Sequence, residues 1–138
     1  MYKIKRMTGK KALAWRWFSK YIRLRDCIKT TGTKEYAICI TCGERTHMSN
    51  LDAGHMIPGR TNSILFDESI VHAQCRPCNT TGGGEKQMYK HVMVQKYGED
   101  WYDMKKAARK RPSKISEHGF SLIAEEYKRK YNELLASL

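Results

Sequence analysis

The chain has no apolar run that approaches the roughly 18 residues of a membrane-spanning helix. Its basic N-terminus, Met1 to Arg6, is not followed by the apolar core of a secretory signal. We therefore expect a cytoplasmic protein. The 138 residues contain no internal repeat and no low-complexity segment, and this length fits a single domain over residues 1–138.

Acidic residues are absent from the first 25 positions, which hold 9 of the chain's 26 Lys and Arg residues. The whole chain has only 14 Asp and Glu, so its formal net charge is +12. An excess of this size indicates an anionic partner rather than a particular fold. Nucleic acid and an anionic membrane surface are the two candidates at this point.

Cysteine is sparse but paired, because four of the 5 residues lie in Cys39-Ile-Thr-Cys42 and Cys75-Arg-Pro-Cys78. Two such pairs around a hairpin-sized segment are the ligand pattern of a tetrahedral zinc site, and in the cytoplasm we prefer it to two disulfides. Four thiolates close the site, so the zinc would stabilise the fold, by on the order of 10 kcal/mol, rather than catalyse. Cys27 has no partner in sequence and is expected to be a small, partly buried apolar residue.

Hydrophobic spacing predicts a first helix from about Gly9 to Asp26, N-capped by Thr8, with a buried stripe of Ala14, Trp15, Phe18, Tyr21 and Ile22. Extended segments are expected at 36–40, 50–57 and 70–74, with a polar loop over 59–69. Gly82 to Gly84 predict a flexible joint, followed by helices at 85–97, 101–109 and 121–138. The chain would then consist of a basic N-terminal helix (1–30), a zinc-stapled core (36–100) and C-terminal helices (101–138).

Basic residues cover the outer faces of the first predicted helix and gather again after residue 104. A face of one sign without carboxylates at i, i+4 favours contact with phosphates over a merely solvated surface. The residues expected to bind nucleic acid are Lys10, Lys11, Arg16, Lys20, Arg23, Arg60, Arg76, Lys105, Lys106 and Arg109.

Three polar residues suited to catalysis lie within or directly after the zinc hairpin: Asp52, His55 and Asn79. Asp52 and Asn79 offer the oxygen ligands that a hard ion such as Mg²⁺ or Mn²⁺ prefers. A neutral His55 can accept a proton from an attacking water. This set suits metal-assisted cleavage of a phosphodiester. Structural alternatives remain open, with Asp52 as a turn residue and Asn79 as a helix cap.

The segments Leu51-Asp-Ala-Gly-His55-Met-Ile, Phe66-Asp-Glu and Val71-His-Ala-Gln-Cys75-Arg-Pro-Cys78-Asn79 resemble the phage NinG family, also called Rap, among the zinc-stapled HNH endonucleases. The resemblance covers about residues 36–100. It implies an α+β fold in which basic helices flank a ββα-metal, treble-clef-like core. It also implies zinc on the four paired cysteines, His55 as general base and Asn79 as a ligand of the catalytic ion.

The same resemblance implies cleavage of branched recombination intermediates, of the Holliday junction or D-loop type, in the cytoplasm of a bacterial host. DNA would be the partner, with no membrane involved. Symmetric cuts in two strands would favour a homodimer. The alternative function is a non-catalytic zinc module that binds nucleic acid. Asp52, His55 and Asn79 distinguish the two, because a binding module has no need of all three.

Three positions depart from the HNH pattern. Gly54 stands directly before the base, where Asp or His is usual, so we expect a bulge at Ala53-Gly54 that lets Asp52 and His55 meet one ion. Ile70 replaces the middle Asn, which organises the loop; His72 is a candidate substitute for that polar contact and a further candidate metal ligand. Gly82 to Gly84 are expected to interrupt the helix that carries Asn79.

Overall fold

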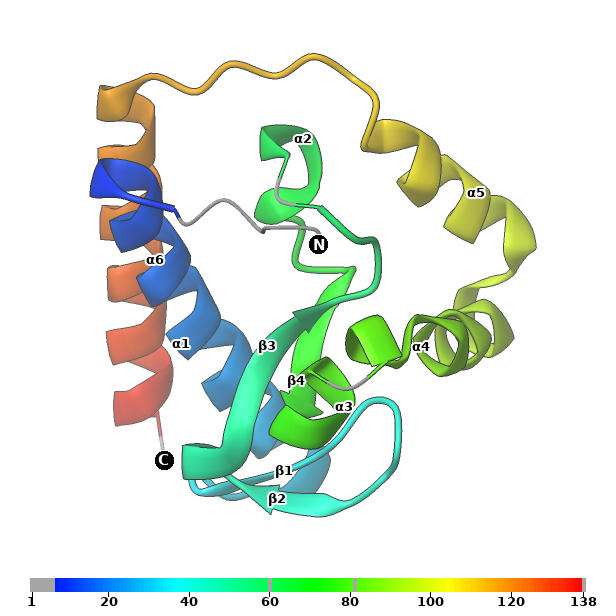
Figure 1. Ribbon diagram of the computed structural model, residues 1–138. Helices are drawn as coiled ribbons and strands as arrows, with labels where there is room; N and C mark the ends of the chain where they lie inside the picture. Colours follow the sequence, from blue (N-terminus) through cyan, green and yellow to red (C-terminus); the bar gives the residue numbers. More distant parts are fainter. Residues whose placement is uncertain (1–6, 60, 81, 138) are drawn as a thin grey trace.

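The computed structural model describes residues 7–59, 61–80 and 82–137. The described strands form two antiparallel sheets of two strands each, β1–β2 and β3–β4, so the fold mixes helices with small antiparallel sheets (Figure 1). No helix in these ranges is long and apolar enough to cross a bilayer. The elements in chain order are α1 (Gly9–Thr31), β1 (Tyr36–Ile38), β2 (Arg45–His47), η1 (Met48–Asn50), β3 (Leu51–His55), α2 (Asn62–Leu65), β4 (Val71–Cys75), α3 (Arg76–Thr80), α4 (Gly82–Tyr97), α5 (Glu99–Ala108) and α6 (Glu117–Ala136).

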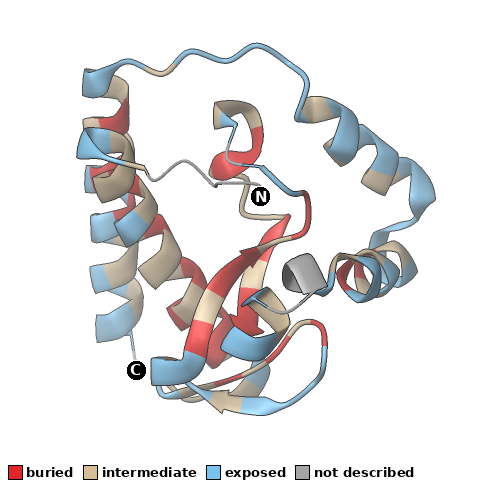
Figure 2. Ribbon diagram, in the orientation of Figure 1, coloured by how far each residue is buried: buried red, intermediate tan, exposed pale blue. Residues whose placement is uncertain are grey.

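Helix α1 lies along α6 and also packs against the β3–β4 sheet (Figure 1). Its buried Ala14, Phe18 and Ile22 share one face because they are spaced at i, i+4 and i+8. Buried residues accordingly concentrate on β3, β4 and the inner side of α1 (Figure 2). The helix runs past the predicted end at Asp26 as far as Thr31. It stops at Gly32, which has the left-handed φ of 72° that glycine tolerates.

A partly buried ion pair between Arg25 and the buried Asp26 fixes α1 against β4. Asp26 is buried, and its Oδ2 accepts a hydrogen bond from the backbone N–H of Ala73 at 2.7 Å. The neighbouring Arg25 donates to Asp26 Oδ1 at 2.9 Å and to the carbonyl oxygens of Glu68 and Val71, each at 2.9 Å. Because a buried charge is costly unless it is paired, these bonds fix where α1 crosses the sheet.

The β3–β4 ladder is regular, and the bulge expected at Ala53-Gly54 is absent. Each residue of β3 faces one residue of β4. Gly54 has a different reason to be glycine, because a Cβ there would lie 2.0 Å from Oε1 of Gln74. Gln74 is wholly buried and lies diagonally across the ladder. Close packing of that side chain, rather than a backbone bulge, therefore requires the glycine.

The connection between β3 and β4 is more ordered than the polar loop that we predicted, since it contains α2. Its last turn is organised by Asp67, whose Oδ1 accepts hydrogen bonds from the backbone N–H and the hydroxyl of Ser69, at 3.0 and 2.6 Å. Ile70, at the position of the missing Asn, is wholly buried, and its carbonyl oxygen accepts from the N–H of Met56 at 2.8 Å. Asp67 and this main-chain bond therefore do the work expected of the Asn.

The helices after β4 differ from the prediction in their bounds. Gly82 to Gly84 are helical and open α4, whereas the helix that carries Asn79, α3, ends at Thr80, before these glycines. On α4, Tyr89 and Met93 are fully buried, whereas Met88 is 49% exposed. Helix α6 begins at Glu117 rather than 121, because the Ser116 hydroxyl caps its first turn by accepting from the N–H of Gly119 at 2.9 Å.

Candidate functional site

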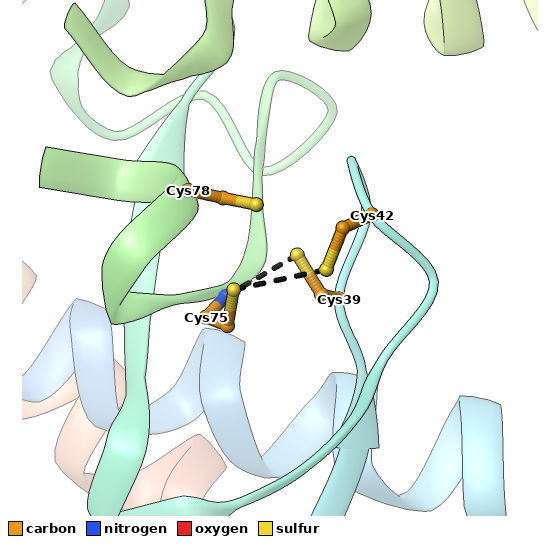
Figure 3. A group of neighbouring side chains, drawn as sticks. All are labelled: Cys39, Cys42, Cys75 and Cys78. Carbon is orange, nitrogen blue, oxygen red and sulfur yellow. Dashed lines mark hydrogen bonds between the residues drawn. The ribbon is translucent and has the colours of Figure 1, made fainter. Parts of the chain in front are cut away.

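The four cysteines of the two Cys-x-x-Cys pairs meet in one cluster (Figure 3). All four sulfurs lie within 4.8 Å of one another, and those of Cys42 and Cys75 are 3.8 Å apart. A tetrahedral ion with Zn–S bonds of about 2.3 Å places its sulfurs about 3.8 Å apart. The cysteines are therefore in position to hold a metal ion, as their spacing predicted.

Main-chain turns present these sulfurs to one another. Gly43 has a left-handed φ of 77° and donates its N–H to the carbonyl of Cys39 at 3.0 Å. Cys75 ends β4, and its N–H donates to Sγ of Cys39 at 3.3 Å. Burial alone would raise the pKa of Cys39, but hydrogen bonds, led by the N–H of Cys42 and the hydroxyl of Thr41, lower it to about 6. These bonds stabilise the thiolate, which is the form that binds metals.

A polar cleft of about 390 Å³ lies beside the cluster, where α1, β3 and α3 meet. It brings together the three residues predicted for catalysis and two predicted to bind phosphate, Arg23 and Arg76. Within the described ranges β3 pairs only with β4, so its second edge has no neighbouring strand. Asp52 and His55 point to opposite faces of β3, and both can line a cleft along that edge although the ladder has no bulge. The lining residues are Trp15, Ser19, Arg23, Leu51, Asp52, Ala53, His55, Arg76 and Asn79.

Two side chains of α3 hold the carboxylate of Asp52. Asn79 Nδ2 donates to Oδ2 at 3.1 Å, and Arg76 Nη2 donates to Oδ1 at 3.4 Å. From α1, burial lowers the pKa of Arg23, and the negative charge of Asp52 opposes that shift. Partners of this kind make Asp52 the centre of a polar cluster rather than a turn residue bonded to backbone N–H groups. Asn79 lies inside α3, which begins at Arg76, so it is not the cap of that helix.

His55 is held on one edge and one face. Its Nε2 is 3.4 Å from the carbonyl oxygen of Leu65. Because a carbonyl only accepts, this bond places the proton of the neutral ring on Nε2 and leaves the lone pair on Nδ1. The ring stacks on Trp15, with 4.8 Å between centroids and 20° between planes. Lys86 of α4 donates to the backbone carbonyl of His55, and burial lowers the pKa of Lys86.

His72 is not among the residues that line this cleft. It faces Gly54 across the ladder, and its Nδ1 is 3.0 Å from the hydroxyl of Tyr89, which donates to the Gly54 carbonyl at 2.8 Å. Burial lowers the pKa of His72 to about 4, so the ring is neutral at physiological pH. His72 thus supports β3 through Tyr89, and this geometry gives no support to a role as metal ligand.

The remaining predicted nucleic-acid contacts lie outside the cleft. Lys10, Arg16, Lys106 and Arg109 are exposed, whereas Lys11 and Lys20 are partly buried. Lys105 is neutralised by Asp67 at 2.8 Å, so it is a structural partner rather than an unpaired phosphate contact. Arg109 also donates to the carbonyl of Pro58 at 3.3 Å. Arg60 lies outside the described residues.

Sequence reasoning missed two residues at His55. The sequence places Trp15 in the buried stripe of α1, because its spacing with Phe18 and Ile22 is helical. In the structure Trp15 is only partly buried, lies at the edge of that stripe and lines the cleft. Lys86 stands in the segment after the three glycines, with no motif around it. Both residues are more than 30 positions from His55 in the chain, and no local sequence pattern predicts their contacts with it.

A family model described as the bacteriophage lambda NinG protein matches residues 2–136 of the chain. The match extends well beyond residues 36–100, on which the motif resemblance rests. Neither the curated proteins nor the solved structures contain a match to the chain.

Proposed function

The chain belongs to the bacteriophage lambda NinG family, and from this premise we propose that it is a metal-dependent endonuclease that cleaves branched DNA recombination intermediates. The observation that carries the proposal is the meeting of Asp52, His55 and Asn79 in one cleft, directly beside a closed four-cysteine cluster. The reaction would be hydrolysis of a phosphodiester bond.

In this proposal the cysteine cluster holds a structural zinc ion. Four thiolates leave no open position on zinc, so the metal acts through the fold. Cys75 ends β4 and Cys78 lies in α3, one residue before Asn79. The ion would therefore hold α3 against the strands and keep Asn79 beside Asp52, which a rigid catalytic site requires.

Asp52 and Asn79 fit a second, hard divalent ion. The two side chains are already in contact at 3.1 Å, and a half-turn of the Asn79 amide exchanges its nitrogen for its oxygen. Two oxygen donors would then face one point in the cleft, as Mg²⁺ or Mn²⁺ prefers. Such an ion supplies stabilisation of the charge that develops on the phosphate and the leaving oxygen.

His55 acts as the general base in this scheme. With its proton on Nε2, it accepts a second proton at Nδ1 from the attacking water. Arg23 and Arg76 line the same cleft and supply positive charge for the phosphate. Arg76 is bound to Asp52 and is more than half exposed, so an entering phosphate can draw its guanidinium away.

The order of elements also favours an HNH-like core. An antiparallel hairpin, β3–β4, carries the base on its first strand, and the helix directly after its second strand carries Asn79. This order supports the ββα-metal core that the resemblance implies. DNA as the partner is favoured by the net charge of +12 and by the two guanidinium groups in the cleft.

The test is cleavage of a four-way DNA junction and of a linear duplex of the same sequence, with Mg²⁺, Mn²⁺ or EDTA. Wild type should cut the junction only with a divalent ion. His55→Ala should lose about 10²–10⁴-fold in rate while keeping zinc and DNA affinity. Asp52→Ala and Asn79→Ala should recover in part at higher Mn²⁺, because they lack a ligand rather than the base.

His118→Ala, at an exposed position in α6, is the matched control and should cleave like wild type. Full metal-dependent activity of His55→Ala would refute the assignment of the base. Wild-type protein that binds junctions tightly but cuts none of them with either ion would identify a non-catalytic zinc module instead.

A further inference from the structure

Trp15 reaches the cleft from α1, whereas Asp52, His55 and Asn79 come from the β3–β4 hairpin and α3. Its indole lies nearly parallel to the imidazole of His55, with 4.8 Å between the ring centroids and 20° between the planes. We propose that Trp15 is a positioning residue for His55 and that its indole stabilises the imidazolium formed when His55 accepts a proton. The inference rests on the proposed function, in which His55 is the base.

Trp15 positions the His55 ring through contact with one of its faces. Rotation of an imidazole about its outer torsion meets only broad preferences. The bond from Nε2 to the Leu65 carbonyl is long, at 3.4 Å, and constrains one edge. The indole covers one face and so fixes the plane of the ring. Trp15 is itself anchored, because it packs against the main core and lies 5.6 Å from the ring of Phe18.

Trp15 also acts on the charged form of His55. Among the residues that the structure describes, Lys86 of α4 donates to the backbone carbonyl of His55, and Arg23 of α1 and Arg76 of α3 line the same cleft. These cations disfavour a positive imidazole, whereas the carboxylate of Asp52 of β3, which lines the same cleft, favours it. The negative face of an indole attracts a cation more than a neutral ring. Trp15 therefore stabilises the imidazolium without adding charge to the site.

The experiment compares Trp15→Leu with Trp15→Phe. Leucine fills much of the space without a π face, whereas phenylalanine keeps one. Trp17→Leu is the matched control, because Trp17 is on the same helix but packs on Tyr131 of α6, with centroids 5.9 Å apart, and does not line the cleft. Two quantities are measured: junction cleavage against pH, and the titration of His55 by NMR in zinc-loaded protein without DNA.

Trp15→Leu should lose about 10- to 100-fold in kcat, as expected for a misplaced base, with junction affinity within about twofold of wild type. The midpoints of its pH–rate profile and of its NMR titration should both fall by about half a pH unit. Trp15→Phe should restore most of the rate and the midpoint, and Trp17→Leu should match wild type.

Wild-type kcat and an unchanged His55 midpoint in Trp15→Leu would overturn the inference while leaving the endonuclease proposal intact. So would a loss of DNA affinity as large as the loss of rate, because Trp15 would then be a binding residue. If Trp15→Leu does not fold, Trp15→Phe is the test: a loss of rate of about 10-fold or more would overturn the inference, because this variant keeps a π face on His55. Failure of wild type to cut DNA is a different result, and the NMR titration still tests the stack.

Discussion

Replacing Gly54 with alanine should destabilise the hairpin that carries Asp52 and His55. The added Cβ would lie 2.0 Å from Oε1, 2.9 Å from Cδ and 3.0 Å from Cβ of Gln74. Gln74 is wholly buried, so its amide has no route to solvent and must move within a filled core. The substitution thus creates a clash that the structure can relieve only by shifting one of the two strands or this side chain.

The expected loss of stability combines three effects. Overpacking of this kind costs about 1–3 kcal/mol. Moving the Gln74 amide also disturbs its 3.4 Å hydrogen bond to the Thr41 hydroxyl, worth about 1 kcal/mol. Replacing a glycine restricts the unfolded chain and offsets about 0.4–1 kcal/mol. A net loss of about 1–3 kcal/mol remains, which corresponds to a fall in Tm of about 3–10 °C for a chain of this size.

The assay is urea denaturation of the zinc-loaded protein, followed by far-UV circular dichroism, as a double-mutant cycle with Gln74→Ala. Removing Oε1 and Cδ of Gln74 removes the two shortest contacts. The double variant should therefore be more stable than the sum of the single changes predicts, by about 1 kcal/mol or more. Strict additivity, or a Gly54→Ala variant within about 0.5 kcal/mol of wild type, would refute the reasoning.

Three further predictions follow. Cys75→Ser should lower the zinc content measured by elemental analysis, whereas Cys27→Ser, at a buried position outside the cluster, should keep it. His72 has a pKa of about 4 when folded and about 6.5 when unfolded, so the stability it contributes is present above pH 6.5 and is lost as pH falls toward 4. His72→Gln should flatten that part of the stability–pH curve, measured by denaturation between pH 7 and about 4.5. Charge reversal at Lys10 and Arg16 should weaken binding to junction and duplex alike. It should also reduce the slope of log Kd against the logarithm of the salt concentration by about two.

Each of these has a contrary result. Zinc retained in full by Cys75→Ser would exclude the cluster as the metal site. A stability–pH curve unaltered in His72→Gln would mean that another group is responsible for the acid sensitivity. A salt dependence unaffected by the double reversal would remove the outer face of α1 from the DNA contacts. Arg129→Glu on α6, where Arg129 pairs with Glu133 at 3.0 Å, is the control for the reversal.

The sequence alone was sufficient for features that depend on residues close together in the chain. Two Cys-x-x-Cys pairs predict one metal cluster, because a three-residue spacing on a turn or helix brings both thiols to one side. The local motifs likewise identified the polar residues that the cleft brings together, namely Asp52, His55 and Asn79. Hydrophobic spacing identified the main helices, although it missed their ends at Thr31 and Glu117.

Tertiary structure decided what depends on register and helix packing. The sequence predicts a bulge at Gly54. The structure shows that glycine is required there because the buried Gln74 side chain, diagonally opposite on β4, leaves no room for a Cβ. His72 and His55 both lie on the hairpin, yet only His55 lines the cleft, since the ladder turns His72 toward Tyr89. Trp15 reaches His55 because α1 packs across the β3–β4 sheet, where buried Phe18 and Ile22 join the core and Asp26 bonds to β4. Contacts of this kind join residues tens of positions apart, and local spacing carries no information about them.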